Sequence, residues 1–253
     1  MEIYFLIAFF IFGIVMGSFY GVVATRLPKG ESIIYPSSHC DYCHSKLRWY
    51  DLIPLFSYLF MKGRCRYCKE KIPFSSFLIE LVTGVLFAVC YHVFKFTPDL
   101  IISLIFVSSL IIVIVSDIEY MIILDEVIFL AMILILITNI IFKGFDTAFT
   151  VLFSGLFSFL LMLFLKIVGD YFFKKESLGG GDIKLMLLFG MVLGFSEAVM
   201  SIFLATFIAF PFSIYVLLSR KDHMIPFGPF LSIAALILYI SGFSFENLLS
   251  LIA

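Results

Sequence analysis

Gly179-Gly180-Gly181-Asp182-Ile183-Lys184 joins three glycines and a carboxylate to the start of an apolar run. A second carboxylate, Asp117, follows the uncharged run 101–116. A carboxylate at the edge of a membrane segment costs free energy to keep there, so each aspartate is a functional candidate. The alternative for each is a helix end that faces water. A single helix cap does not need three glycines, which favours a functional role for Asp182.

The composition places the chain among polytopic membrane proteins. Hydrophobic residues make up 62% of the chain, which includes 33 Phe, and the mean hydropathy is +1.14. These values lie far from the balance of a soluble domain. The net charge of −1 gives no basic field, so we expect the partner to be the lipid bilayer and not nucleic acid.

Eight apolar runs are predicted to form transmembrane helices. The first, 3–25, can cross a hydrocarbon core of ~30 Å. It lacks the preceding positive charge and the cleavage site of a secretory signal, so we expect it to be retained. After a polar segment the others follow at 74–94, 100–116, 122–142, 148–168, 183–195, 198–218 and 225–251. The run 183–195 is short and needs the glycine triplet at membrane depth to complete a crossing. We therefore expect an all-α polytopic membrane protein with about eight transmembrane helices.

The charge distribution predicts the orientation of these helices. With the N-terminus outside, only Lys95 and Lys143 of the 17 Lys and Arg residues fall outside. The rest lie at or beside the loops 26–72, 117–121, 169–182 and 219–224. This asymmetry follows the positive-inside rule. Asp117 and Asp182 then both lie at cytoplasmic helix ends, where the fold can join them as an acid/base pair.

The polar segment 26–72 contains four of the five cysteines and is expected to form a small cytoplasmic domain. Cys40-Asp41-Tyr42-Cys43 and Cys65-Arg66-Tyr67-Cys68 are two C-x-x-C pairs with 21 residues between them, close to the spacing of a four-thiolate zinc site. Disulfides are the alternative, but they do not persist in a reducing cytoplasm. His39 and His44 could replace a sulfur ligand or be solvated. Four thiolates leave no open position, so the Zn²⁺ should be structural.

Several motifs together resemble the type IV prepilin leader peptidases, the G-x-G-D aspartyl proteases of bacterial membranes. The segment 179–185 resembles the G-x-G-D-x-K-L motif of that family, and 116–125 resembles the segment around its other catalytic aspartate. The remaining matches are Gly17-Ser18-Phe19, Arg26-Leu27-Pro28, the cysteine loop with Asp51-Leu52-Ile53-Pro54 and Gly63-Arg64-Cys65-Arg66, and Glu80. We therefore expect a first helix at 1–25, a zinc loop at 26–72 and a seven-helix peptidase core at 73–253.

The resemblance implies an endopeptidase that cuts the basic leader from prepilins or pseudopilins at the cytoplasmic face of the bacterial inner membrane. Such enzymes serve type IV pilus assembly, protein secretion or competence. Asp117 and Asp182 would form the catalytic pair, in which one carboxylate draws a proton from water and the other, protonated, supports the scissile carbonyl. Gly179, Gly180 and Gly181 would let backbone approach the substrate, and Lys184 belongs to the same motif.

The alternative function is a cation or proton-coupled transporter in which Asp117 and Asp182 are ion ligands. Transporters usually hold such charges near the bilayer midplane, between two related halves. Here both carboxylates are expected at one face, and the sequence shows no repeat. These features favour the peptidase.

The resemblance also implies N-methylation of the new N-terminal residue with S-adenosylmethionine as donor. The cysteine loop accompanies the bifunctional members of the family, and Gly63 matches a position tied to methyl transfer. The amine must lose a proton before it attacks the methyl group, and Glu80 or Asp51 could accept that proton or hold the amine. Alternatively, Glu80 pairs with a Lys or Arg of the loop. No glycine-rich dinucleotide motif is present, so the donor site must be built from the loop and the helix ends.

Overall fold

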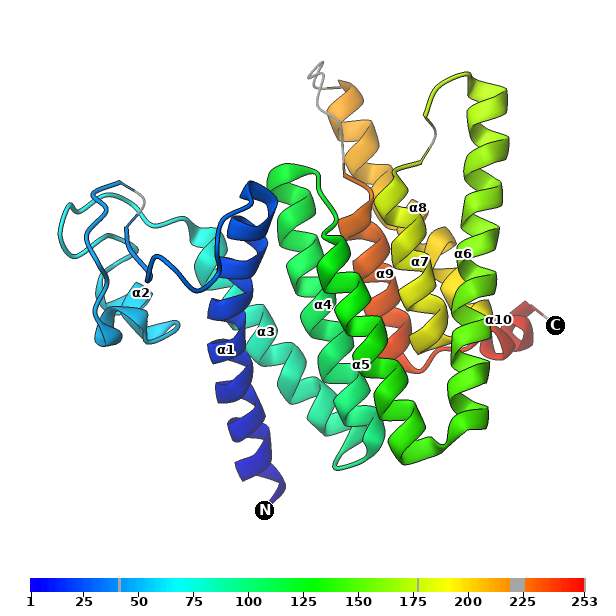
Figure 1. The fold of residues 1–253 in the computed structure, drawn as a ribbon, viewed down its shortest axis with the longest axis horizontal. Helices are drawn as coiled ribbons and strands as arrows, with labels where there is room; N and C mark the ends of the chain where they lie inside the picture. The colour runs from blue at the N-terminus through cyan, green and yellow to red at the C-terminus, as the bar shows by residue number, and fades with distance from the viewer. Residues whose placement is uncertain (41, 177, 219–225, 253) are drawn as a thin grey trace. The chain divides into compact units, whose positions relative to one another are not determined.

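The computed structural model describes residues 1–40, 42–176, 178–218 and 226–252, and its regular structure is helical throughout these residues (Figure 1). Six of the described helices are long and apolar enough to span a membrane. They are α1 (Glu2–Arg26), α3 (Phe74–Phe94), α4 (Pro98–Tyr120), α5 (Asp125–Lys143), α6 (Phe145–Phe173) and α8 (Phe195–Leu218). The predicted all-α, multi-pass membrane fold is confirmed.

Two further helices correspond to the remaining predicted spans but are shorter. α7 (Gly180–Leu193) and α9 (Gly228–Ser241) have 14 residues each. At a rise of 1.5 Å per residue each is about 21 Å long, less than the ~30 Å hydrocarbon core. The run predicted at 225–251 is broken, because Gly242 adopts a left-handed conformation (φ 63°) that ends α9 before α10 (Phe245–Ile252) begins. The predicted loop 219–224 lies outside the described residues.

The chain divides into two compact units, Met1–Phe96 and Thr97–Ala253. In the first unit, α1 and α3 pack directly on each other. A Cβ at Gly13 would lie 2.8 Å from Cα of Gly84, and one at Gly17 would lie 2.9 Å from Cα of Glu80. Small residues at these positions let the two backbones approach, which is how helices associate in lipid. The segment between α1 and α3 carries the short helices η1 (Leu27–Lys29), η2 (Trp49–Leu52) and α2 (Phe56–Phe60).

In the second unit, α7 is the central helix and packs against α5, α6, α8 and α9. Figure 1 shows α7 between α6 and α9. The side chains of Leu185, Leu188 and Phe189 have no exposed surface. A Cβ at Gly190 would lie 2.7 Å from Cα of Gly155, so glycine permits the close contact between α6 and α7. The body of α7 is thus enclosed by neighbouring helices, whereas Gly179 and Gly180 at its N-terminal end are exposed.

Candidate functional site

Asp117 and Asp182 line the same open cleft of about 1000 Å³ in the second unit. Asp117 lies in the last turn of α4 and Asp182 in the first turn of α7. Their exposed fractions are 6% and 7%, and their charges are close enough to interact. The structure therefore brings together the two carboxylates that the sequence analysis paired.

Each of these carboxylates accepts a hydrogen bond from the amide of a residue where a helix begins. Gly228, the first residue of α9, donates to Asp117, and Gly179, the N-cap of α7, donates to Asp182. Helix N-termini carry partial positive charge and are natural sites for anions. The starts of α7 and α9 thus hold the two carboxylates in place by hydrogen bonds.

Gly228 is a site residue that the sequence analysis did not find. A Cβ at this position would lie 2.5 Å from Oδ2 of Asp117 and 3.1 Å from Cδ1 of Ile123. Pro229, directly after it, has no amide hydrogen and favours the first turn of a helix. A glycine before a proline at a helix start was the available signal, although it does not indicate which side chain the glycine faces.

The three glycines of the motif make different contacts. Gly179 provides the amide that binds Asp182. Gly180 has open space where a Cβ would be, because no atom lies within 4 Å of that position. A Cβ at Gly181 would lie 2.7 Å from Cβ of Ile123, so the missing side chain lets the segment between α4 and α5 pack there. Each glycine thus has its own role: Gly179 binds Asp182, Gly180 leaves space in the cleft, and Gly181 permits close packing.

Lys184 joins the motif helix to the start of α5. Its Nζ lies 2.6 Å from both Oδ1 and Oδ2 of Asp125. Lys184 was predicted to support the motif. The ion pair does so by connecting α7 to the first residue of α5. Both side chains are partly exposed and line the cleft beside the aspartates.

The four sulfurs of Cys40, Cys43, Cys65 and Cys68 all lie within 4.8 Å of one another. Tetrahedral Zn–S bonds of about 2.3 Å place sulfurs about 3.8 Å apart, and Sγ of Cys40 lies 3.8 Å from Sγ of Cys68. All four cysteines are free thiols in the structure. The cluster can therefore hold a metal ion, as the spacing predicted.

The two C-x-x-C pairs have the same backbone geometry. The amides of Cys40 and Cys65 donate to the carbonyls of Ser45 and Glu70, five residues on in each case. The hydrogen bond between Sγ of Cys43 and the Ser45 side chain lowers the pKa of Cys43 to about 6, and the backbone amide of Cys68 lowers the pKa of Cys65. These shifts favour the thiolate at Cys43 and Cys65, the form that binds metal, whereas desolvation and the neighbouring cysteine sulfurs raise the pKa of Cys68 to about 12.

The histidines beside the first pair do not belong to the cluster within the described residues. Nδ1 of His39 lies 3.0 Å from the carbonyl oxygen of Ser37. The rings of His39 and His44 are neighbours, with centroids 5.9 Å apart. The two histidines therefore lie beside the thiolates, and this arrangement does not favour either of them as a replacement for a sulfur ligand.

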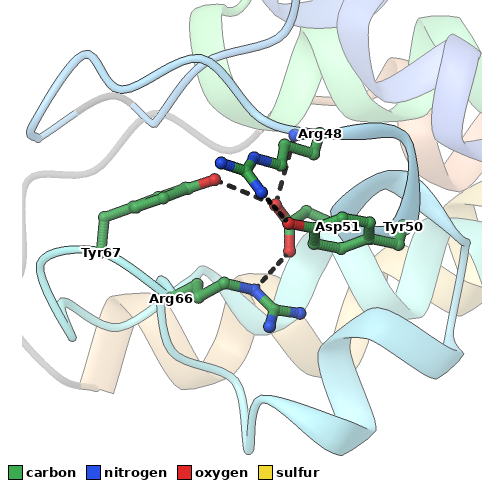
Figure 2. Close-up of polar contacts among 5 residues, drawn as sticks. All are labelled: Arg48, Tyr50, Asp51, Arg66 and Tyr67. Carbon is green, nitrogen blue, oxygen red and sulfur yellow. Dashed lines mark hydrogen bonds and ion pairs between the residues drawn. The ribbon is translucent and has the colours of Figure 1, made fainter.

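Figure 2 shows the polar contacts of Asp51 with residues of the cysteine loop. Its Oδ1 accepts a 2.7 Å hydrogen bond from Nε of Arg66, and its Oδ2 accepts one of 3.2 Å from the amide of Arg48. Arg66 and Tyr67 stand between the cysteines of that pair, and the hydroxyl of Tyr67 lies 3.5 Å from Oδ2. The Arg66 guanidinium also lies 4.9 Å from the ring centre of Tyr50. A fully buried carboxylate with these donors is suited to shaping the loop.

A second cavity, of about 190 Å³, lies within the first unit beneath the cysteine loop. Glu80 lines it, and its Oε2 accepts a 2.7 Å hydrogen bond from the amide of Leu55. The hydroxyl of Ser18 also binds Glu80. Gly63 lies behind Tyr58, another lining residue, since a Cβ at Gly63 would be 2.8 Å from the Tyr58 hydroxyl oxygen. Of the three residues predicted to serve methyl transfer, Glu80 and Asp51 line the cavity, and Gly63 lies next to the lining residue Tyr58.

Fold and site together define a multi-pass helical membrane protein with a paired-carboxylate cleft and a four-thiolate loop. The chain belongs to the type IV leader peptidase family. Residues 104–214 match the family described by that name, and residues 11–94 match the bacterial peptidase A24 N-terminal domain. The two matched segments fall one in each compact unit.

Three similar proteins carry the name prepilin leader peptidase/N-methyltransferase. The protein from Bacillus subtilis is 33% identical, with 92% of this chain and 93% of the relative covered. The protein from Vibrio cholerae is 29% identical, with coverages of 95% and 98%. The protein from Pseudomonas aeruginosa is 29% identical, with coverages of 94% and 91%. No solved structure matches the chain.

Proposed function

We propose that this chain is a prepilin leader peptidase and N-methyltransferase of the bacterial inner membrane. The observation that carries the peptidase is the pair of buried carboxylates, Asp117 and Asp182, in one cleft. Two neighbouring carboxylates do not both ionise readily, so the pair holds one proton between them. That state supplies a base and an acid at the same site.

In the proposed reaction, the ionised aspartate takes a proton from water, and the resulting nucleophile attacks the scissile carbonyl. The protonated aspartate donates a hydrogen bond to the carbonyl oxygen. The tetrahedral intermediate then breaks at its C–N bond, and the proton taken from water passes to the leaving amine. The open space at Gly180 gives an extended substrate access to the cleft. The cleft lies where apolar helices end, so a substrate can place a polar leader there while its apolar helix stays in lipid.

The positive-inside distribution of Lys and Arg supports a cytoplasmic location for this cleft, with the N-terminus outside. Reagents that do not cross the membrane should label single cysteines placed at Lys95 and Lys143 in intact cells. They should not label the loop between Cys40 and Cys68. Labelling of that loop from outside would reverse the orientation.

Methyl transfer is the second proposed activity, and the cavity of the first unit favours it. S-adenosylmethionine, when bound, supplies a methyl group on a positively charged sulfur. The carboxylate of Glu80 and the neighbouring aromatic rings fit a group of that charge. Glu80 is the candidate for holding or deprotonating the amine, since Asp51 is already paired with Arg66, whereas Glu80 is bound only by neutral donors.

The experiment that tests both activities combines the purified full-length chain with a prepilin and S-adenosylmethionine, followed by mass spectrometry. We expect a product shortened by its leader and carrying one methyl group. A cleaved product without the methyl mass would show that the chain is a peptidase but not a methyltransferase. An uncleaved substrate, together with Asp117-dependent cation flux in liposomes, would favour the transporter.

For the cysteine cluster, we propose one structural zinc ion per chain and expect Cys40→Ser and Cys65→Ser each to lose it. A missing thiolate leaves a three-ligand site, and a loop with so small a core depends on its metal to fold. Metal content is measured on purified protein, and Cys90→Ser, which changes a buried cysteine of α3, is the control and should retain zinc. A stoichiometric disulfide without metal in protein from native membrane would contradict the proposal.

A further inference from the structure

Glu80 is a partly buried carboxylate with no cationic partner among the described residues. Its hydrogen bonds come from the amide of Leu55 and the hydroxyl of Ser18, both of which are neutral groups. The described ion pairs of the first unit, Asp51–Arg66 and Glu2–Lys95, leave it out. Arg66 and Lys71 also line the cavity. Asp51 balances the charge of Arg66, and the described ion pairs include none between Lys71 and Glu80. The charge of Glu80 is therefore available to a cationic ligand.

Aromatic side chains accompany this carboxylate in the cavity wall. The rings of Tyr58 and Phe77 both line the cavity, and their centroids are 5.2 Å apart. Glu80 and Phe77 lie on neighbouring turns of α3, while Tyr58 comes from α2. Carboxylates and aromatic faces together recognise onium groups, because a ring face and an anion both attract a diffuse positive charge.

The backbone that positions Glu80 is strained. Leu55 has φ 61° and ψ −51°, and the amide of Phe56 donates to the carbonyl of Pro54 at 2.7 Å. This is a γ-turn of the rare kind, which a leucine adopts only at a cost in free energy. The amide of Leu55 in this turn is the one that binds Glu80. Such strain persists where the surrounding structure maintains it, and ligand sites are a common setting.

Gly63 influences the same cavity through Tyr58. Gly63 has φ +66°, and a Cβ there would lie 2.8 Å from Oη and 2.9 Å from Cζ of Tyr58. Any side chain at this position would displace the Tyr58 ring. Gly63 is absent from the cavity lining itself. Gly63 therefore acts on the cavity indirectly, through the position of the Tyr58 ring.

We infer that the cavity of the first unit binds the sulfonium end of the methyl donor between the Tyr58 ring and the Glu80 carboxylate. Gly63 acts as a positioning residue for Tyr58. The inference rests on the proposed methyl transfer and names the site that the donor occupies.

Binding to the purified, zinc-loaded full-length chain tests the inference without any measurement of turnover. The probes are S-adenosylmethionine and S-adenosylhomocysteine, which lacks the methyl group and the positive charge, compared by equilibrium dialysis. We expect Tyr58→Leu and Glu80→Gln each to weaken binding of S-adenosylmethionine about tenfold, within the range of cation–π interactions and ion pairs. Binding of the homocysteine compound should change far less, because it is neutral at sulfur.

The matched control is Tyr35→Leu, the same substitution at an exposed tyrosine of the first unit that does not line the cavity. It should bind both compounds as the unmodified chain does, and every variant should retain zinc and leader cleavage. Unchanged binding in Tyr58→Leu and Glu80→Gln, with methylated product still formed, would overturn the inference and leave methyl transfer intact. If the unmodified chain neither binds the donor nor methylates, both the inference and the second activity fail.

Discussion

Asp117→Asn and Asp182→Asn should each abolish leader cleavage, with a fall in kcat of roughly 10²–10⁴-fold, the range typical of general acid–base catalysis. Asparagine has the size of aspartate but neither accepts nor donates the proton that the reaction moves. Because the two carboxylates share one cleft and act together, either change removes the function of the pair. Initial rates of prepilin cleavage by purified variants give the measurement.

Asp125→Asn is the matched control, since it neutralises a third carboxylate of the same cleft that is bound to Lys184. We expect it to lose less activity than either variant of the pair. All three variants should retain zinc, because the thiolates belong to the other compact unit. Near-normal turnover of Asp117→Asn or Asp182→Asn would show that the pair is misassigned and would make Asp125 the next candidate.

The proximity of Asp117 and Asp182 could be predicted from sequence because two independent patterns agreed. Apolar runs placed each aspartate at the end of a helix, and the asymmetry of Lys and Arg placed both ends on one side. The spacing of the four cysteines likewise predicted their cluster, since a tetrahedral ion needs two pairs of sulfurs. Local sequence patterns can therefore predict a site when the spacing of its residues along the chain, or the ends of its membrane helices, determine its geometry.

The lengths of α7 and α9 could not be read from hydropathy. Both helices are apolar, and their buried residues include Leu188 and Leu231. An apolar run looks the same whether lipid or protein surrounds it. The end of α9 depends on the left-handed conformation of one residue, Gly242, which the hydropathy of the run does not indicate.

Asp51 and Glu80 have the same predicted role but different partners in the structure. Asp51 is bound to Arg66 of the second cysteine pair, whereas Glu80 accepts hydrogen bonds from neutral groups. The expected alternative for Glu80 was an ion pair with a basic residue of the loop, and the described residues contain none. Arg66 lies 15 residues from Asp51, and the partners of Glu80 come from segments distant from α3 in sequence, so no local pattern records these contacts.

Gly228→Ala should lower kcat for cleavage roughly 100-fold, because misplacing a catalytic group by about 1 Å has an effect of that size. The added Cβ would lie 2.5 Å from Oδ2 of Asp117, well inside van der Waals contact. The carboxylate is the movable end of its side chain, so we expect it to turn away while α9 stays folded. Asp117 would then lose its alignment with Asp182 and its hydrogen bond from the Gly228 amide.

The kinetic signature distinguishes this displacement from general damage. Substrate contacts elsewhere in the cleft remain, so KM should change little while kcat falls. Gly21→Ala is the control, because a Cβ at that helical glycine meets no atom within 4 Å, and it should cleave at the normal rate. Thermal unfolding measured for both variants checks that each remains folded. A normal kcat in Gly228→Ala, or a fall in activity that only matches a loss of folded protein, would mean that Gly228 does not position Asp117 for catalysis.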